Sequence, residues 1–100
     1  MGISSDAIVG ASASLVEGKW SWPVHGLRHP AEGDTSGWYV WTGDFIEADD
    51  FFHAWHVGHL VDAVPQLAHL LELPAGSRFL IAPEHEDVWT DSSLLELESP

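Results

Sequence analysis

The chain of 100 residues carries 16 acidic against 3 basic residues, and its formal net charge of -13 at pH 7 disfavours binding to nucleic-acid phosphates or anionic lipid surfaces. It has no cysteine, which excludes a disulfide framework, a thiolate nucleophile and a cysteine-based zinc site. With 45% hydrophobic residues it predicts one domain over residues 1–100, whose ends at 1–6 and 96–100 we expect to be frayed.

The N-terminal part predicts strands. It lacks the basic start and long apolar run of a signal peptide, so we expect a cytoplasmic protein without a membrane span. Residues 7–16 are small and apolar, which fits either a strand with a bend or a strand followed by a short helix. Trp20, Trp22 and Val24 then alternate with other residues in the period of a strand. Pro23 places that strand at a sheet edge or marks its end.

The clearest predicted strand is in the segment WYVWTGDF, and Gly37 and Gly43 bound it. Trp38 and Val40 share one face of it, and Tyr39 and Trp41 share the other, so both faces are apolar. We favour a central strand that is covered on both sides. The alternative is a strand whose aromatic face is a working surface.

The middle of the chain predicts two helices. After the acidic segment DFIEADD, apolar residues recur at helical spacing and predict a helix over 52–64 that Asp49 or Asp50 caps. Pro65 suits the first turn of a second helix over the segment PQLAHLLEL. The leucines expected to face inward from it are Leu67, Leu70 and Leu71.

The C-terminal part returns to strands and loops. SRFLIAP predicts a buried strand, and EHEDVWTDSS predicts an acidic loop with Val88 and Trp89 as its apolar anchors. LLELESP fits a short strand, a helical turn or a frayed tail. Strands, two helices and further strands together predict the α+β class: a small, mainly antiparallel sheet with about two helices packed on one face.

Three histidines stand at every third position of FFHAWHVGHL, namely His53, His56 and His59. On the predicted helix they fan across about 120° and climb about 9 Å, so they do not converge on one tetrahedral ion. A structural role fits better, with His53 partly buried, His56 at the boundary and His59 exposed. The alternative is a small metal-dependent or hydrolytic protein that uses His53, His56 and His85. We expect no catalytic residue, no cofactor and no metal.

A pattern of aromatic and glycine positions runs through the larger part of the chain. Its members are Val9, Leu15, Gly18, Arg28, Pro30, Asp34, Ser36, Gly37, Trp38, Gly43 and Asp44, followed by the segment FLIAPEHEDVW. In these positions the sequence resembles the type thirty-three immunity proteins of bacterial polymorphic-toxin systems, a family first catalogued as a domain of unknown function. The resemblance implies a protein that neutralises a toxin by binding, and it carries no catalytic signature.

Two acidic segments beside aromatic strands predict a partner-binding surface. Acidic side chains attract a basic protein, and a large aromatic side chain supplies the apolar anchor of an interface. The predicted contact residues are Asp44, Glu47, Asp49, Asp50, Glu84, Glu86, Asp87 and Trp89. We therefore predict a non-enzymatic, immunity-like protein that neutralises a basic partner, a cognate bacterial toxin, by direct contact. A subunit that forms homodimers through its tryptophan-bearing sheet is a further alternative.

Overall fold

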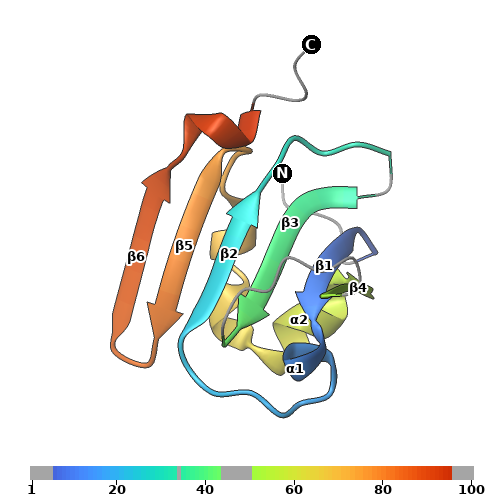
Figure 1. The fold of residues 1–100 in the computed structure, drawn as a ribbon, viewed down its shortest axis with the longest axis vertical. Helices are drawn as coiled ribbons and strands as arrows, with labels where there is room; N and C mark the ends of the chain where they lie inside the picture. The colour runs from blue at the N-terminus through green and yellow to red at the C-terminus, as the bar shows by residue number, and fades with distance from the viewer. Residues whose placement is uncertain (1–5, 34, 44–50, 96–100) are drawn as a thin grey trace.

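A six-stranded sheet organises the chain (Figure 1). The computed structural model describes residues 6–33, 35–43 and 51–95. Its elements in chain order are β1 (Ile8–Ser12), α1 (Ala13–Val16), β2 (Val24–Arg28), β3 (Thr35–Thr42), β4 (Phe52–His56), α2 (Val57–Ala63), the 3-10 turns η1 (Pro65–Leu67) and η2 (Leu70–Glu72), β5 (Ser77–Ala82), β6 (His85–Thr90) and η3 (Ser92–Leu95). Most of the predicted frayed ends, residues 1–5 and 96–100, lie outside the described residues.

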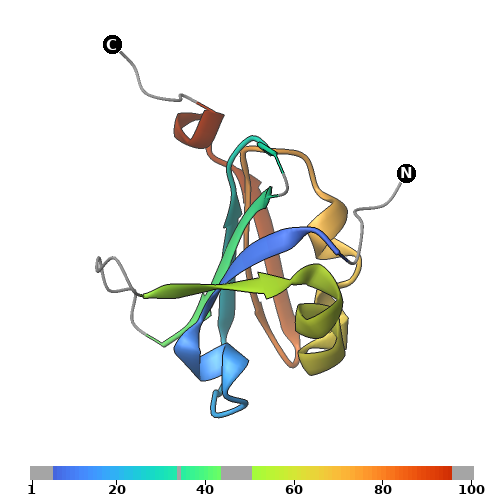
Figure 2. The ribbon, with the colours of Figure 1, turned by 90° about the vertical axis from the view of Figure 1, so that its right-hand side faces the viewer.

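The strand order is β4-β1-β3-β2-β5-β6. The pair of β1 with β3 is parallel, and the other four neighbouring pairs are antiparallel. The helix α2 and the turns η1 and η2 lie together on one side of this sheet (Figure 2). The predicted α+β class, with a mainly antiparallel sheet and helices on one face, is confirmed.

The strand β3 confirms the clearest sequence prediction, and its two faces differ. Trp38 and Val40 point to the helix side and are completely buried. The indole N–H of Trp38 donates a hydrogen bond to the carbonyl of Leu71 at 2.8 Å, which ties the sheet to η2. On the opposite face Trp41 is 6% exposed and Tyr39 is 38% exposed. One face of β3 therefore belongs to the core, and the other reaches the surface at Tyr39.

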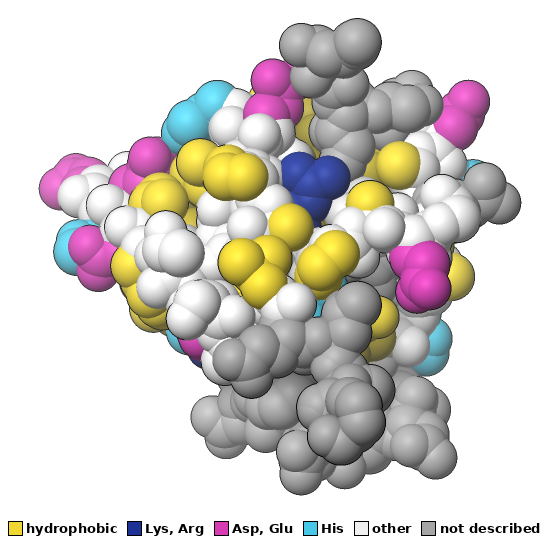
Figure 3. Space-filling view, turned by 90° about the horizontal axis from the view of Figure 1, so that it is seen from above, with side chains coloured by type: hydrophobic (Ala, Val, Ile, Leu, Met, Phe, Trp, Pro, Cys, Tyr) yellow, Lys and Arg dark blue, Asp and Glu magenta, His cyan; other side chains and the backbone are white. Residues whose placement is uncertain are grey.

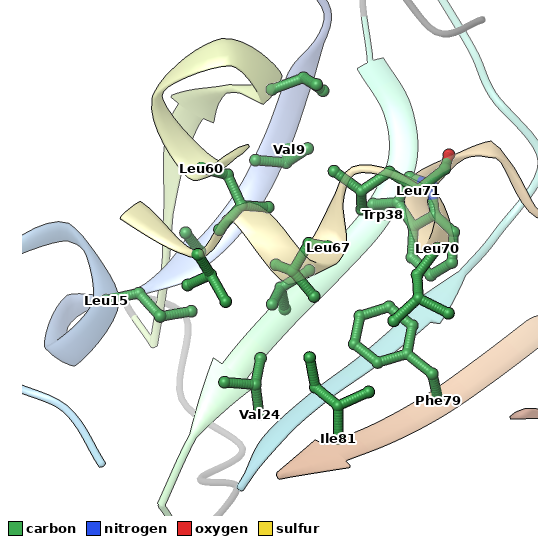
Figure 4. Packing of buried hydrophobic residues seen from close by; sticks show 14 residues of the cluster. Val9, Leu15, Val24, Trp38, Leu60, Leu67, Leu70, Leu71, Phe79 and Ile81 are labelled. Carbon is green, nitrogen blue, oxygen red and sulfur yellow. The ribbon is translucent and has the colours of Figure 1, made fainter. Parts of the chain in front are cut away.

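The core lies between the sheet and the helices (Figure 4). The labelled side chains that meet there are Val9, Leu15, Val24, Trp38, Leu60, Leu67, Leu70, Leu71, Phe79 and Ile81. Burial of each such leucine or valine stabilises the fold by about 1.5–3 kcal/mol relative to exposure. This layer is what holds the opposite face of the sheet in a fixed shape.

The second predicted helix is two 3-10 turns instead. Ala68 N–H donates to the carbonyl of Pro65 and Leu73 N–H to that of Leu70, each at 3.1 Å, so each turn closes over three residues. Leu67, Leu70 and Leu71 are all buried in the core. The predicted inward direction of the three leucines is confirmed, although the helix type is wrong.

The predicted helix over 52–64 is wrong in its first half. Phe52–His56 forms β4, which pairs with β1 along its whole length, and α2 begins at Val57. His56 is the N-cap residue and makes no side-chain cap bond. Asp49 and Asp50, the predicted caps, lie outside the described residues. The exposed edge of β1 supplies backbone partners to this segment, and that pairing overrides its helical pattern.

The strand predicted to carry Trp20, Trp22 and Val24 is wrong: the strand starts after Pro23 instead of ending there, and it lies between β3 and β5, not at a sheet edge. β2 begins at Val24, directly after this proline, so Trp20 and Trp22 stand outside the strand. Their rings contact each other edge to face with centroids 5.0 Å apart, and both pack against the core. Of the two structures that residues 7–16 allow, the chain adopts the strand followed by the short helix α1.

Candidate partner-binding surface

We call the side of the sheet that faces away from α2, η1 and η2 the open face. Alternate side chains of each strand point to it, and the strand registers align them in rows. Trp41 lies opposite His25, and Arg78 lies opposite Trp89. The larger side chains on the open face include His25, Leu27, Tyr39, Trp41, Phe52, Arg78, Leu80, Asp87 and Trp89.

Aromatic rings cover the part of the open face that β4, β3 and β2 provide. Tyr39 contacts Phe52 edge to face, with ring centroids 5.0 Å apart. Trp41 contacts Phe52 at 6.0 Å and stacks on His25 at 5.3 Å with an interplanar angle of 15°. Such aromatic pairs contribute about 0.5–1.5 kcal/mol each beyond the area they bury. The rings therefore support one another, and a partner would meet them already ordered.

A hollow of about 200 Å³ lies beside these rings. Gly10 and Gly37 both line it, together with the Tyr39 and Phe52 rings. A Cβ atom at Gly10 would lie 2.6 Å from Cδ2 of Tyr39, and one at Gly37 would lie 1.9 Å from the carbonyl oxygen of His29. This hollow was not predicted from the sequence. The available signals were Gly10 in the middle of the apolar segment 7–16 and Gly37 directly before a predicted strand, since glycine in a strand often marks a close approach.

Arg78 is the basic centre of the open face. Its guanidinium lies over the Trp89 ring at 5.8 Å, and its Nη1 donates a hydrogen bond to Oδ2 of Asp91 at 3.1 Å. Burial lowers the pKa of His25, and the positive charge of Arg78 lowers that pKa further. His25 is thus uncharged at pH 7 and stacks on Trp41 as a neutral ring.

Two of the three basic residues, Arg28 and Arg78, already donate hydrogen bonds within the protein. Arg28 donates hydrogen bonds to the carbonyls of Ser36 at 2.9 Å and Leu73 at 2.6 Å, and burial lowers its pKa.

Figure 3 shows apolar side chains gathered around a basic one at one end of the molecule, with acidic side chains at the margin. The carboxylates without an ion-pair partner among the described residues include Glu17, Asp62 and Glu72. The negative charge is therefore left for solvent or a partner.

Three of the eight predicted contact residues, Glu86, Asp87 and Trp89, lie in a strand. Residues 85–90 form β6 at the edge of the sheet, so the predicted acidic loop is wrong. All six residues of β6 are exposed. An edge strand that is exposed on both faces needs no alternation of apolar and polar residues, and the sequence therefore carried no strand signal.

The alternation of β6 separates the predicted contact residues. Asp87 and Trp89 point to the open face, whereas Glu86 points to the helix side and lies 3.1 Å from Nε2 of His69. Glu84 is exposed in the turn between β5 and β6. The other predicted contacts, Asp44, Glu47, Asp49 and Asp50, lie outside the described residues.

The structure does not bring together the histidines of the metal hypothesis. His53 and His56 lie on β4 at one edge of the sheet, and His85 lies on β6 at the opposite edge. His53 is exposed, which corrects its predicted partial burial, and His59 is exposed as predicted. Among residues 6–33, 35–43 and 51–95, no group of three or more histidine, aspartate or glutamate side chains is arranged to hold a metal ion.

The family model described as the Imm33-like domain matches residues 2–91. The chain belongs to the Imm33-like family. The match contains every element from β1 to β6, so the resemblance to the type thirty-three immunity proteins is confirmed for this Imm33-like domain. No curated protein and no solved structure matches it.

No helix within the described part of this Imm33-like domain is long and apolar enough to cross a membrane.

Proposed function

We propose that this chain is a non-enzymatic immunity protein that binds a basic protein toxin and neutralises it by direct contact. The observation that carries the proposal is the Imm33-like match over residues 2–91, because the family is one of immunity proteins. The net charge of -13 supports a basic partner, since opposite charge speeds association and disfavours wrong partners. A cytoplasmic location remains a prediction of the sequence.

The open face is the proposed contact surface. It combines an ordered aromatic cluster, a hollow of about 200 Å³ with mostly apolar walls and the exposed pair Asp87 and Trp89. Trp89 is 45% exposed and rests on Arg78, which makes it a large anchor whose position is already set. Aromatic anchors surrounded by polar groups are where binding energy concentrates in protein interfaces.

The test uses the protein encoded by the neighbouring gene as the candidate toxin. Binding to the purified chain is measured by titration calorimetry at low and high salt, and protection is measured as growth during co-expression. We expect tight binding that weakens with salt, because opposite charges on exposed surfaces are screened. Trp89→Ala should weaken binding about 30-fold or more, as for an interface hot spot.

Matched charge reversals locate the surface. Asp87→Lys on the open face and Asp62→Lys on α2 change the net charge equally. We expect Asp87→Lys to weaken binding by at least about tenfold and Asp62→Lys to change mainly the association rate. Equal loss from both reversals would place the contact elsewhere, and absence of binding by the wild-type chain would overturn the proposed function.

A further inference from the structure

The edge strand β6 has a free side. In the strand order β6 is outermost, and it pairs with β5 alone among the described elements. The backbone groups on its outer side therefore have no strand partner within the described residues. Such an edge is a template on which another chain can form a further strand.

The register identifies the backbone groups that face outward. Directly after β6, Asp91 N–H donates to the carbonyl of Gly76 at 2.7 Å and so points toward β5, while Gly76 N–H bonds instead to the carbonyl of Arg28. Hydrogen-bonded and non-hydrogen-bonded pairs alternate along an antiparallel ladder. The next hydrogen-bonded pairs are Arg78–Trp89, Leu80–Asp87 and Ala82–His85. The N–H and C=O groups of Glu86, Val88 and Thr90 consequently point to the free side.

The side chains beside this edge are alike on both faces of the sheet. Val88 and Trp89 are each 45% exposed, and they point to the helix side and the open face respectively. Glu86 likewise points to the helix side and Asp87 to the open face. Glu86 lies 3.1 Å from His69 and Asp87 lies 2.8 Å from His85, yet their side chains remain 48% and 59% exposed and so open to a partner. Each face at the edge thus offers one apolar and one acidic side chain, and an added strand would cover both kinds.

The charge decides between the occupants of such an edge. A second copy of this chain would add the same acidic pair and a further charge of -13 along one edge. Like charges that face each other across strands destabilise the pairing. An extended segment with lysine or arginine side chains brings opposite charge to Glu86 and Asp87 instead.

We propose that the basic partner adds an extended segment as a strand to the free edge of β6. Backbone hydrogen bonds form with Glu86, Val88 and Thr90, and basic side chains of the segment lie beside Glu86 and Asp87. This mode is β-strand addition, in which the backbone bonds provide affinity and the flanking side chains provide specificity. The inference rests on the proposed function, because it names how that partner is held.

Amide hydrogen exchange of the wild-type chain tests the proposal without a variant. In the free chain the amides of Asp87 and Trp89 are bonded to β5 and should exchange slowly, whereas those of Glu86, Val88 and Thr90 should exchange quickly. On addition of the protein encoded by the neighbouring gene, we expect the three fast amides to slow at least about tenfold.

A proline substitution provides the second test. Val88→Pro removes an outward N–H and breaks no bond to β5, so the fold tolerates it at an edge position. Val88→Thr keeps the N–H and the branched shape and is the matched control. We expect the proline variant to bind at least about tenfold more weakly and the threonine variant to bind within about threefold of wild type.

The outcomes separate this inference from the proposed function. If the wild-type chain binds the neighbouring gene product while the three amides keep their fast exchange, strand addition is wrong and the proposed function stands. If the wild-type chain does not bind it, the proposed function fails and the inference with it. If the three amides are protected in the free chain in a concentration-dependent way, a second copy occupies the edge and the inference is wrong.

Discussion

Gly37 is the position at which a single methyl group should most damage the fold. It has φ of +88°, and a Cβ atom built there would lie 1.9 Å from the carbonyl oxygen of His29. That oxygen belongs to the backbone and cannot rotate away as a side chain could. The two residues are also joined by a hydrogen bond of 2.9 Å from His29 N–H to the Gly37 carbonyl. Gly37→Ala therefore has to displace one strand from the other.

The expected loss has three parts. The left-handed backbone costs an alanine about 1–2 kcal/mol. Displacement of the strands weakens the bond between His29 and Gly37, which contributes about 0.5–1.5 kcal/mol. The clash itself adds strain, so we expect Gly37→Ala to lower the free energy of unfolding by about 3 kcal/mol or more. For a domain of this size that is a fall in Tm of about 12 °C or more.

Gly18→Ala is the matched control. Gly18 has φ of +73°, but a Cβ atom there would meet nothing within 4 Å. An alanine there meets the same cost of a left-handed backbone, but no clash. Alanine also restricts the unfolded chain, which offsets part of this cost, so we expect Gly18→Ala to lower the free energy of unfolding by about 1 kcal/mol. Urea unfolding followed by tryptophan fluorescence measures both variants. Equal losses for Gly18→Ala and Gly37→Ala would refute the close approach of His29 to Gly37.

Three further variants test the core and the open face. Leu67→Ala, at a completely buried site, should cost about 2–5 kcal/mol in urea unfolding. Trp38→Phe should cost about 2–4 kcal/mol, because it leaves the Leu71 carbonyl without its 2.8 Å bond and opens a small cavity. His25→Gln should reduce the loss of stability on acidification. Because burial and Arg78 lower the folded pKa of His25, the unfolded chain binds this proton more readily, and the wild type loses stability as the pH falls through about 6.5.

For each of these variants, one result would contradict the prediction. A Leu67→Ala loss below about 1 kcal/mol would mean that η1 does not pack on the sheet as described. For Trp38→Phe, the comparison is Trp89→Phe, which keeps an exposed ring and should change stability by less than about 0.5 kcal/mol. If His25→Gln and wild type lost stability in parallel from pH 8 to pH 5, the lowered pKa of His25 would be wrong.

The sequence predicted those elements whose apolar pattern is decided locally. β3 and β5 are buried on at least one face, so the apolar residues of each segment predict a strand without knowledge of its neighbours. β4 and β6 are the two edges, and their residues are largely exposed. In β4 a helical pattern from α2 runs back into the segment, and the pairing with β1 that decides its structure is remote in sequence.

The candidate site was predicted only in part, because its residue types are visible locally whereas their arrangement depends on strand pairing. The acidic and aromatic character of β6 was visible in the sequence, and so was the alternative of an aromatic working face on β3. The division of Glu86 from Asp87 and Trp89 depends on the strand period, which a predicted loop does not have. The hollow depends on Gly10 and Gly37, which lie far apart in sequence and meet because β1 and β3 are neighbours.

The place of β1 in the sheet determines when this domain can fold during synthesis. β1 is the first strand of the chain, yet its backbone partners are in β3 and β4, which end at Thr42 and His56. The core is completed later still, by Phe79 and Ile81 of β5. A growing chain on the ribosome therefore carries an unpaired β1 until most of the domain has emerged. Under the proposed function, only completely synthesised and folded copies of the chain would bind a toxin. A toxin synthesised at the same time would therefore have to become active no sooner than the chain folds.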